Sequence, residues 1–289
     1  MTEAPVSTAT AHTRFAAIRA RLEAYQPRPG WRIWTFEFLL FGFKQGWACL
    51  FGALMLALLL ATFLYYPENA ALARYDAITI GAVIIQIAML AFKLETIEEA
   101  RVILVFHVVG TAMELFKTSV GSWIYPEPSL LHIGAVPLFS GFMYASVGSY
   151  LARVWRIFDF QFTSFPSRGW LIAIASGIYV NFFTHHWMVD LRWLMFALVL
   201  WQFWGCNVAF KPFRTRYAMP LLFGFLLVAL FIWFAENIGT YTHAWAYPNQ
   251  RHGWAPVGIA KLGSWYLLMI ISFVLVALLH HKPDPYHSR

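Results

Sequence analysis

Two glutamates stand at matching places in two similar stretches of this 289-residue chain. Glu114 and Glu236 each begin the pattern Glu-x3-Thr-x4-Trp-x-Tyr-Pro. A carboxyl group that is kept away from water can hold its proton near neutral pH and deliver it to a substrate. The pattern therefore predicts a duplicated acid site.

The other repeated residues are aromatic side chains and a proline behind each glutamate. They are Thr118, Trp123, Tyr125 and Pro126 in the first copy and Thr240, Trp245, Tyr247 and Pro248 in the second. Trp and Tyr just beyond a helix end are ordinary anchors at a membrane surface, and Pro stops a helix. Aromatic faces also stabilise cations, which would suit substrate binding. Both interpretations stay open for these rings.

Further polar residues accompany the glutamates. His107 precedes Glu114 by two helical turns, close to the same helix face. A Gly-x-x-Tyr segment follows each copy at the same distance and ends in Tyr144 and in Tyr266. We interpret His107 and Tyr144 as candidates to hold an attacking water, and Tyr266 as a candidate substrate-binding residue.

A simpler role for the glutamates is a buried ion pair. A carboxylate inside a membrane is costly and is often paired. The available partners are Lys117, one turn after Glu114, and Lys261 for Glu236. These two lysines do not occupy equivalent positions of the repeat, which weakens the ion-pair interpretation.

A metal site is a second alternative. His186 and Asp190 are four residues apart and His185 is adjacent, a spacing that would suit metal ligands on a helix. An interfacial pair bound to water explains the same spacing. The chain has no phosphate-binding Gly loop, dinucleotide fingerprint or Ser or Cys nucleophile motif. We therefore expect no cofactor and no metal.

The elements that position these residues must be membrane helices. The chain is 60% hydrophobic and 12% charged, which a soluble domain of this length could not bury. Eight apolar runs are long enough to cross a hydrocarbon core of about 30 Å, near residues 46–65, 77–94, 102–121, 133–154, 169–185, 191–210, 219–238 and 258–281. The expected fold is an all-α polytopic membrane protein.

The basic residues predict its orientation. With the N-terminus in the cytoplasm, the inner segments hold sixteen Lys and Arg and the outer segments five. This is a positive-inside distribution, so both termini should be cytoplasmic. The net charge of +7 then fits anionic lipid at the inner surface and requires no nucleic acid.

The repeat extends beyond the acid motif. Ala91-Phe92-Lys93 recurs as Ala209-Phe210-Lys211, and the two motif copies are 122 residues apart. That offset divides the chain into four-helix halves at 34–160 and 161–281, and an even helix count makes the repeats parallel. Both glutamates should therefore face the same, outer side.

The termini and the cysteines complete the organisation. Residues 1–33 have no cleavable signal pattern and read as an amphipathic cytoplasmic helix or a disordered tail, and residues 282–289 read as a cytoplasmic tail. Residues 32–44 are an interfacial segment or an extension of the first helix. Cys49 and Cys206 should lie near the reducing cytoplasm, so we expect no disulfide.

At the acid motif the sequence resembles a family of bacterial integral membrane proteins catalogued as domain of unknown function 817. The resemblance covers most of the chain after about residue 33. It implies a multi-pass protein of the bacterial inner membrane and implies no particular activity.

The motif is also similar, more weakly, to membrane enzymes of carotenoid synthesis, namely carotenoid 1,2-hydratase and the small-subunit type of lycopene cyclase. The matching residues are Glu114, Gly121, Trp123, Tyr125, Gly134, Val136 and Pro137, and in part Glu236, Gly239, Trp245 and Tyr247. The second copy lacks the Gly two residues before Trp245. The paired acidic residues that follow the Pro in the cyclases are replaced by Leu138, Phe139 and Ser140. This likeness implies alkene protonation and favours hydration over cyclisation.

Two functions follow from these patterns. The first is an enzyme that protonates a double bond of a hydrophobic, isoprenoid-like substrate, with Glu114 as the preferred acid. The alternative is a proton-coupled transporter of a small solute, with one carboxylate in each half. Helices near 102–121 and 219–238 lack a central Gly/Pro interruption, which is less typical of carriers.

Overall fold

The computed structural model describes residues 30–250 and 252–280. These residues form nine α-helices and five short strands, arranged in chain order as α2 (Trp31–Ala48), α3 (Leu50–Tyr65), α4 (Arg74–Ala91), α5 (Ile97–Ser119), β1 (His132–Ile133), β2 (Val136–Pro137), α6 (Phe139–Phe158), β3 (Gln161–Thr163), α7 (Arg168–Thr184), α8 (Arg192–Phe203), β4 (Asn207–Phe210), β5 (Tyr217–Pro220), α9 (Leu221–Tyr241), the 3-10 turn η1 (Pro248–Gln250) and α10 (Ala260–His280). The predicted features before residue 30 and after residue 280 lie outside this range.

The chain consists of two compact units with a boundary between Phe43 and Lys44. In its described part the first unit is the helical stretch 31–43, which was expected to be interfacial or an extension of the first helix. The second unit holds all the other elements and the whole of the acid motif.

Each predicted apolar run overlaps most of one helix, from α3 to α10 in order. Among the described helices, α4, α5, α9 and α10 are long and apolar enough to cross a membrane, and a fifth span results if α2 and α3 count as one broken span. Helices α3, α7 and α8 have only 16, 17 and 12 residues. The chain is thus mostly helical with four to five candidate membrane spans.

Two of the predicted helix boundaries are wrong. Residues 132–137 form the β1–β2 hairpin, so α6 starts at Phe139 instead of residue 133. Residues 207–210 form β4, the middle strand of an antiparallel sheet with β3 and β5, so α8 ends at Phe203. Apolar periodicity does not distinguish a short buried strand from the end of a buried helix.

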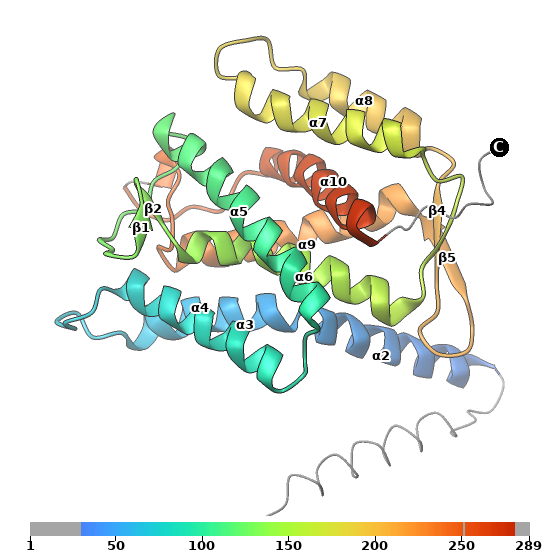
Figure 1. The fold of residues 1–289 in the computed structure, drawn as a ribbon, viewed down its shortest axis with the longest axis horizontal. Helices are drawn as coiled ribbons and strands as arrows, with labels where there is room; N and C mark the ends of the chain where they lie inside the picture. Colours follow the sequence, from blue (N-terminus) through green and yellow to red (C-terminus); the bar gives the residue numbers. More distant parts are fainter. Residues whose placement is uncertain (1–29, 251, 281–289) are drawn as a thin grey trace, which may run out of the picture. The chain divides into compact units, whose positions relative to one another are not determined.

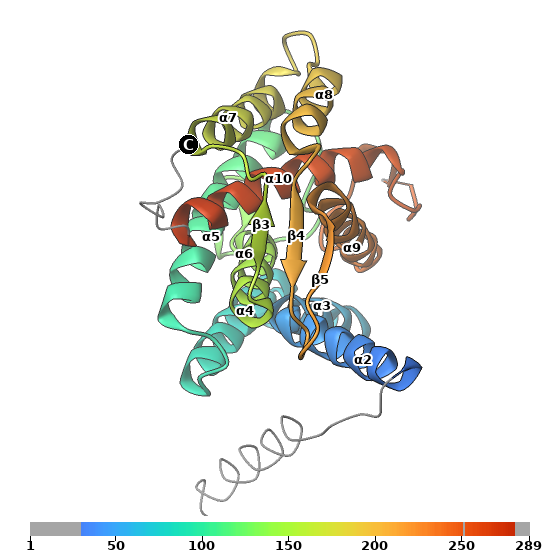
Figure 2. The ribbon, with the colours of Figure 1, turned by 90° about the vertical axis from the view of Figure 1, so that its right-hand side faces the viewer.

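The hairpin and the three-stranded sheet lie at opposite ends of the helices (Figure 1). We call these ends the hairpin end and the sheet end. Helices α5 and α9 both finish at the hairpin end, where α6 and α10 begin. Two helices hold the bundle together: α6 packs against α3, α4, α5 and α10, and α10 packs against α6, α7 and α9 (Figure 2).

Helices α5 and α6 approach closely where a glycine of one helix packs against a large side chain of the other. A Cβ on Gly110 would come within 2.6 Å of the Tyr144 ring, and a Cβ on Gly141 within 2.3 Å of the His107 ring. Small residues let membrane helices approach closely, which increases their van der Waals contact. Sequence spacing alone did not indicate that His107 and Tyr144 belong to this packing.

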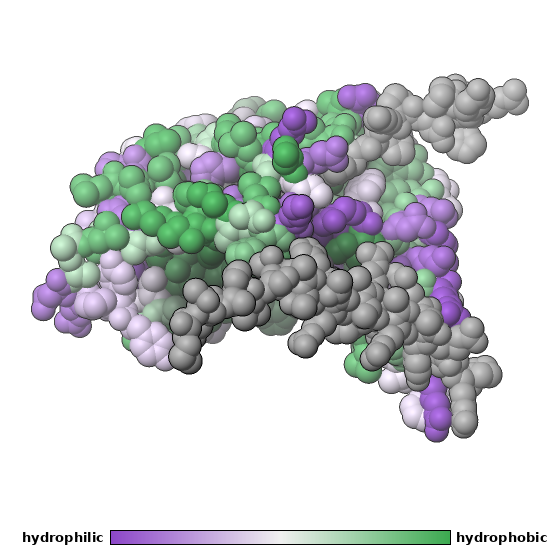
Figure 3. Space-filling model, turned by 60° about the horizontal axis from the view of Figure 1, so that its bottom comes forward, coloured by the Kyte–Doolittle hydropathy of each residue, from purple (hydrophilic) through white to green (hydrophobic). Residues whose placement is uncertain are grey.

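Large apolar side chains cover much of the outside of the described chain (Figure 3). Trp193, Trp204 and Val189 are each about four-fifths exposed, at 81%, 79% and 80%. Such a surface in water would promote association, whereas lipid solvates it. The exposed apolar surface therefore agrees with a membrane protein.

Candidate functional site

Both motif glutamates are buried near the hairpin end of the bundle. Glu114 is five residues before the end of α5 and Glu236 five residues before the end of α9, with exposed fractions of 4% and 3%. A carboxyl group in such a place requires polar partners, because an unpaired one costs several kcal/mol, of the order of 2–7. The predicted burial of both acids is confirmed.

Glu114 accepts three hydrogen bonds from aromatic side chains. The indole Nε1 of Trp123 and the hydroxyl of Tyr125 both donate to Oε2, each at 2.7 Å. The hydroxyl of Tyr144 on α6 donates to Oε1 at 2.8 Å. The loop after α5 thus folds back so that the motif residues Trp123 and Tyr125 reach the acid that precedes them.

Glu236 accepts two hydrogen bonds, from Tyr247 and from Trp265. The Tyr247 hydroxyl donates to Oε1 and the Trp265 indole Nε1 donates to Oε2. Trp265 lies on α10 and was not predicted as a site residue. The signal that could have found it is its position beside Tyr266, inside the repeated Gly-x-x-Tyr segment.

Two residues predicted from the repeat do not reach Glu236. The ring of Trp245 packs over Gly239, where a Cβ would lie 2.1 Å from the indole. Tyr266 directs its hydroxyl to the Leu222 carbonyl at 3.4 Å. Trp245 and Tyr266 therefore do not contact the acid, because packing turns each ring toward another neighbour, and their substrate-binding role stays a prediction.

Aromatic donors to the two acids also contact each other. Trp123 meets Tyr247 edge to face with ring centroids 6.1 Å apart, and Tyr144 meets Trp265 at 6.5 Å. In each pair one ring donates to Glu114 and the other to Glu236. We call these four rings the aromatic enclosure. It places both carboxylates in one shared surrounding.

The loops that carry the motif pair directly. Ile124 and Ala246 form an isolated antiparallel bridge, with both N–H···O distances 2.9 Å. Arg74 ties the same loops together, because it binds the Glu127 carboxylate at 2.6 Å and the Thr242 carbonyl at 2.9 Å. The backbone around the two acids is thus fixed by contacts between the copies.

The tyrosines of the motif loops stay protonated. Burial raises the pKa of both Tyr125 and Tyr247 well above the usual value, and the neighbouring carboxylates raise it further. A phenol that keeps its proton acts as a hydrogen-bond donor to an acid. The geometry therefore assigns Tyr125 and Tyr247 to donate to Glu114 and Glu236.

The lysines do not form the predicted ion pairs. In the described part of the chain, Lys117 places its Nζ 2.8 Å from Nε2 of His186 and not at Glu114. Lys261 lies over the ring of Tyr247, with Nζ 4.2 Å from its centroid. The ion-pair interpretation of both glutamates is wrong, since aromatic donors occupy the carboxylate oxygens.

His107 has no hydrogen bond to Glu114 among the described contacts. Its ring lies against Gly141 and stacks at a tilt on Phe142, with centroids 4.7 Å apart. The two turns between His107 and Glu114 give them a similar direction, whereas the His107 ring packs on α6. The expected position of His107 near Glu114 therefore produces no hydrogen bond to the acid, and its role in holding a water stays a prediction.

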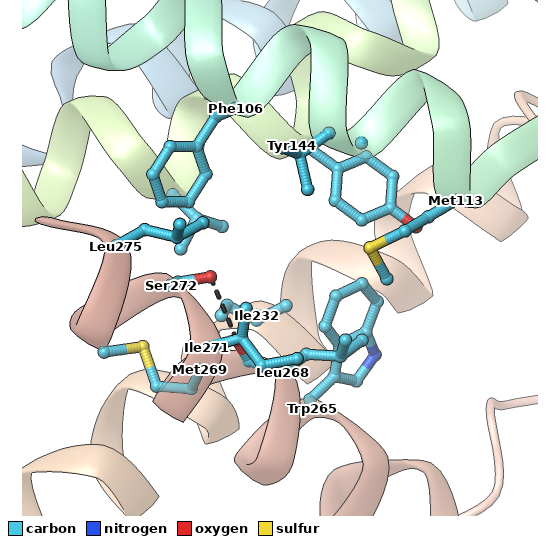
Figure 4. Close-up of a pocket in the computed structure, with 13 residues that line it drawn as sticks. Phe106, Met113, Tyr144, Ile232, Trp265, Leu268, Met269, Ile271, Ser272 and Leu275 are labelled. Atoms are coloured by element: carbon cyan, nitrogen blue, oxygen red, sulfur yellow. Dashed lines mark hydrogen bonds between the residues drawn. The ribbon is translucent and has the colours of Figure 1, made fainter. Parts of the chain in front are cut away.

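An apolar crevice of about 30 Å³ opens beside the aromatic enclosure (Figure 4). Side chains of α5, α6, α9 and α10 line it, among them Met113, Tyr144, Ile232, Trp265 and Leu268. Its volume corresponds to about two water molecules. Tyr144 and Trp265 thus join the crevice to Glu114 and Glu236 through their hydrogen bonds.

Residues 37–273 match the family described as "Protein of unknown function (DUF817)". The chain belongs to this family. It is similar to "Uncharacterized protein YoaT" of Bacillus subtilis (strain 168), with 45% identity over 239 residues that cover 83% of this chain and 90% of the relative. No solved structure matches the chain. The resemblance to this family at the acid motif is thereby confirmed.

The histidine and aspartate residues between α7 and α8 are bound to other partners in this member of the DUF817 family. His186 is committed to Lys117, and Asp190 accepts hydrogen bonds from the Asn181 amide at 3.2 Å and the Arg192 backbone at 2.9 Å. Although partial burial acts to raise it, these hydrogen bonds lower the pKa of Asp190. Residues 30–250 and 252–280 contain no group of three or more His, Cys, Asp or Glu side chains that could hold a metal.

A second buried polar cluster lies at the other end of α5, which sequence reasoning missed. Arg153 on α6 binds Glu95 at 2.9 Å, and both side chains are fully buried. Ser149 and Gln86 donate to the same carboxylate at 2.6 and 2.7 Å. In the sequence, Arg153 counts only as one of the sixteen inner basic residues. Its partner Glu95 is 58 residues away, and residue spacing does not reveal a contact over such a distance.

Proposed function

We propose that the protein is an integral membrane enzyme in which Glu114 and Glu236 deliver a proton to a double bond of an apolar, isoprenoid-like substrate. One observation carries this proposal. The donors Tyr144 and Trp265 both bind the acids and line the apolar crevice. A substrate in the crevice would therefore lie one side chain from two buried carboxyl groups.

The charges of the two acids favour a stored proton. Two negative charges in one dry enclosure are costly when no cation is paired with either. One proton held by the pair removes that cost. Its transfer to an alkene carbon breaks the carboxyl O–H bond, forms a C–H bond and leaves a carbocation on the substrate.

The same side chains can then guide the second half of the reaction. Faces of the aromatic enclosure attract a cation that lies over them. Water adds to the cation, and the proton that this water loses returns to the carboxylate. The net reaction is hydration, in which the acid is regenerated and no oxidant or reductant takes part.

Hydration is preferred to cyclisation because of the residues after the β1–β2 hairpin. Leu138, Phe139 and Ser140 stand where the cyclases carry paired acids, and Phe139 is fully buried in an aromatic cluster with Tyr75 and Tyr125. A cyclase-type second acid has no equivalent at this position. The likeness to carotenoid hydratases supports the same choice.

Our proposed topology is eight membrane helices as two parallel four-helix halves with both termini in the cytoplasm of a bacterial inner membrane. The Ile124–Ala246 bridge supports it, because equivalent loops meet as parallel repeats require. Both acids lie at the hairpin end, which the charge count assigns to the outside. The buried cluster of Glu95 and Arg153 then belongs to the cytoplasmic side.

A proton-coupled transporter of a small solute is the second candidate. One observation favours it: α5 and α6 join a buried carboxylate at one end, Glu114, to a buried ion pair at the other, Glu95 with Arg153. Ionisable side chains inside membrane helices often mark proton or ion paths. The apolar lining of the crevice beside Tyr144 and Trp265 favours the enzyme.

The test uses cells that make linear carotenoids. We expect wild-type protein to yield hydrated pigment, detected by chromatography and mass spectrometry, and Glu114→Gln and Glu236→Gln to yield much less. Glu98→Gln is the matched control, because Glu98 is exposed on the first turn of the same helix as Glu114. Unchanged pigment with wild-type protein would reject carotenoids as substrates, and equal product from all variants would remove the acids from the chemistry.

A further inference from the structure

Three basic side chains gather beside the acid pair at the hairpin end. Lys117, Lys261 and Arg192 come from α5, α10 and α8. Lys117 lies over Phe182, which lines one pocket with Arg192 and packs against the aromatic cluster on which Lys261 rests. The charges of Lys261 and Arg192 accordingly act on Lys117. Arg74, at the same end, is matched by Glu127. Like charges repel, so such a gathering is costly unless an anion compensates it.

The two lysines of this group have no acidic partner within ion-pair distance in the described chain. Lys117 is 3% exposed, and its Nζ lies 4.0 Å from the Phe182 ring centroid and 2.8 Å from His186. Lys261 rests on the ring of Tyr247. Aromatic faces and a neutral imidazole contact the two lysines, and the charges of Asp190 and Glu236 act on them only from beyond ion-pair distance.

A second pocket of about 30 Å³, which four polar and four apolar residues line, adjoins this group. We call it the mixed pocket. Its polar lining is Asn181, His185, Arg192 and Ser264, and Phe182, which contacts Lys117, lines it as well. Asp190 adjoins two of these residues, because it accepts a hydrogen bond from the Asn181 amide at 3.2 Å and lies 3.3 Å from Arg192. The pocket thus lies next to three basic side chains, of which Arg192 alone forms an ion pair with an acid of the described chain.

The mixed pocket and the apolar crevice share one wall. Leu268 of α10 lines both, whereas Ser264 lines only the mixed pocket and Trp265 only the apolar crevice. A molecule with an anionic head and an apolar chain would match the two spaces in that order. Its chain would pass the indole that donates to Glu236.

We propose that Lys117, Lys261 and Arg192 bind the phosphate head of an anionic amphiphile whose chain lies along α10 toward the apolar crevice. A phosphate monoester carries about −1.5 to −2 charges at neutral pH, which matches the two unpaired lysines. Ammonium and guanidinium groups form strong, charge-assisted hydrogen bonds with its oxygens. That this amphiphile is the substrate rests on the proposed function, whereas the anion site does not.

Isothermal titration calorimetry of the full chain in phosphatidylcholine nanodiscs tests the site, with empty nanodiscs as the blank. The probes are hexyl phosphate, inorganic phosphate and the neutral hexanol. We expect hexyl phosphate to bind most tightly, since it alone has both parts. Lys261→Gln and Arg192→Gln should each raise its Kd about tenfold or more, and Lys117→Gln likewise.

Lys211→Gln is the matched control, because Lys211 is exposed beyond β4 near the sheet end. Lys261 and Arg192 are only partly buried, so we expect their Gln variants to fold even if Lys117→Gln does not. If Lys261→Gln and Arg192→Gln both bound hexyl phosphate with wild-type affinity, the site would be overturned. Inorganic phosphate that binds as tightly as hexyl phosphate would uphold the anion site and overturn the amphiphile.

The acid variants separate this inference from the proposed function. Glu114→Gln should lower turnover by about two to four decades yet keep the Kd for hexyl phosphate. Loss of product with unchanged binding supports both proposals. A different result would separate the two proposals: the wild-type protein binds hexyl phosphate, the three basic variants bind it more weakly, and no protein converts an alkene. That result would reject the proposed function and uphold the anion site.

Discussion

Two copies of one sequence motif build two different acid sites in this protein. In the first copy Trp123 donates its indole N–H to Glu114. In the second copy the equivalent Trp245 lies over Gly239, and Trp265 of α10 donates to Glu236 instead. The same residue type at the same spacing therefore has a different partner in each half.

The residue one turn after the acid explains the difference. Lys117 occupies the repeat position of Gly239. Without a side chain, Gly239 leaves room for the Trp245 ring, whereas Lys117 carries a long side chain at the equivalent position that extends to His186. A single small residue thus decides where a large ring packs, and the ring decides which donor reaches the carboxylate.

The surroundings of the two acids differ in a second respect. Glu114 has three neutral donors, and Glu236 has two donors with the Lys261 ammonium nearby on the Tyr247 ring. Residues Gly110 and Met113, next to Glu114 on α5, also line the apolar crevice. We therefore keep Glu114 as the preferred proton donor and assign Glu236 to hold or return the proton.

The largest expected effect is on turnover. Glu114→Gln keeps the side-chain shape and removes the acid, so turnover should fall by about two to four decades. Glu236→Gln should cost less if the two acids divide the work as described. Initial rates of product formation in isolated membranes measure both, with Glu98→Gln as the control. A larger loss with Glu236→Gln would reverse the assignment of the two acids.

The next largest effect is expected from substituting the two tryptophans near Glu236, Trp265 and Trp245. Trp265→Phe leaves an oxygen of Glu236 without its donor, and hydrogen bonds to charged groups contribute about 1.5–3 kcal/mol. Trp245→Phe changes packing over Gly239 and leaves the acid untouched. Turnover should therefore fall with Trp265→Phe and stay near wild type with Trp245→Phe. Equal turnover for the two variants would mean that Trp265 has no special relation to the acid.

Gly239→Ala addresses the cause of the difference between the copies. The new Cβ would lie 2.1 Å from the Trp245 indole, and such overpacking costs about 1–3 kcal/mol. Gly224→Ala on the same helix has open space and a better helix former, so it should be neutral or slightly stabilising. Thermal unfolding in detergent compares them, and an unchanged Tm for Gly239→Ala contradicts the close packing.

The smallest effect concerns the repeated tyrosines. Tyr144→Phe removes one of three donors to Glu114 and should cost about 1 kcal/mol. Tyr266→Phe removes only a long contact of 3.4 Å to the Leu222 carbonyl and should cost close to nothing. Chemical denaturation of both variants decides this. If Tyr266→Phe destabilised the protein as much as Tyr144→Phe, the two tyrosines would contribute equally to stability although their hydrogen bonds differ.

The sequence by itself determined the protein class, the places of the helices and the burial of both acids. Long apolar runs and few charges are local properties, and a helix forms wherever a run is long enough to need its own backbone hydrogen bonds. The burial of Glu114 and Glu236 follows from their place within such runs. Helix ends at residues 133 and 210 were beyond this reasoning, since short strands look equally apolar.

Only the tertiary structure decided the partners. Trp265 reaches Glu236 because α10 packs against α9, and Arg153 meets Glu95 because α6 packs against α5. His107 and Glu114 share a helix face in the sequence, yet the His107 ring packs against Gly141 of α6. Periodicity defines which way a side chain points, whereas the neighbour it meets depends on the shapes of helices distant in the chain.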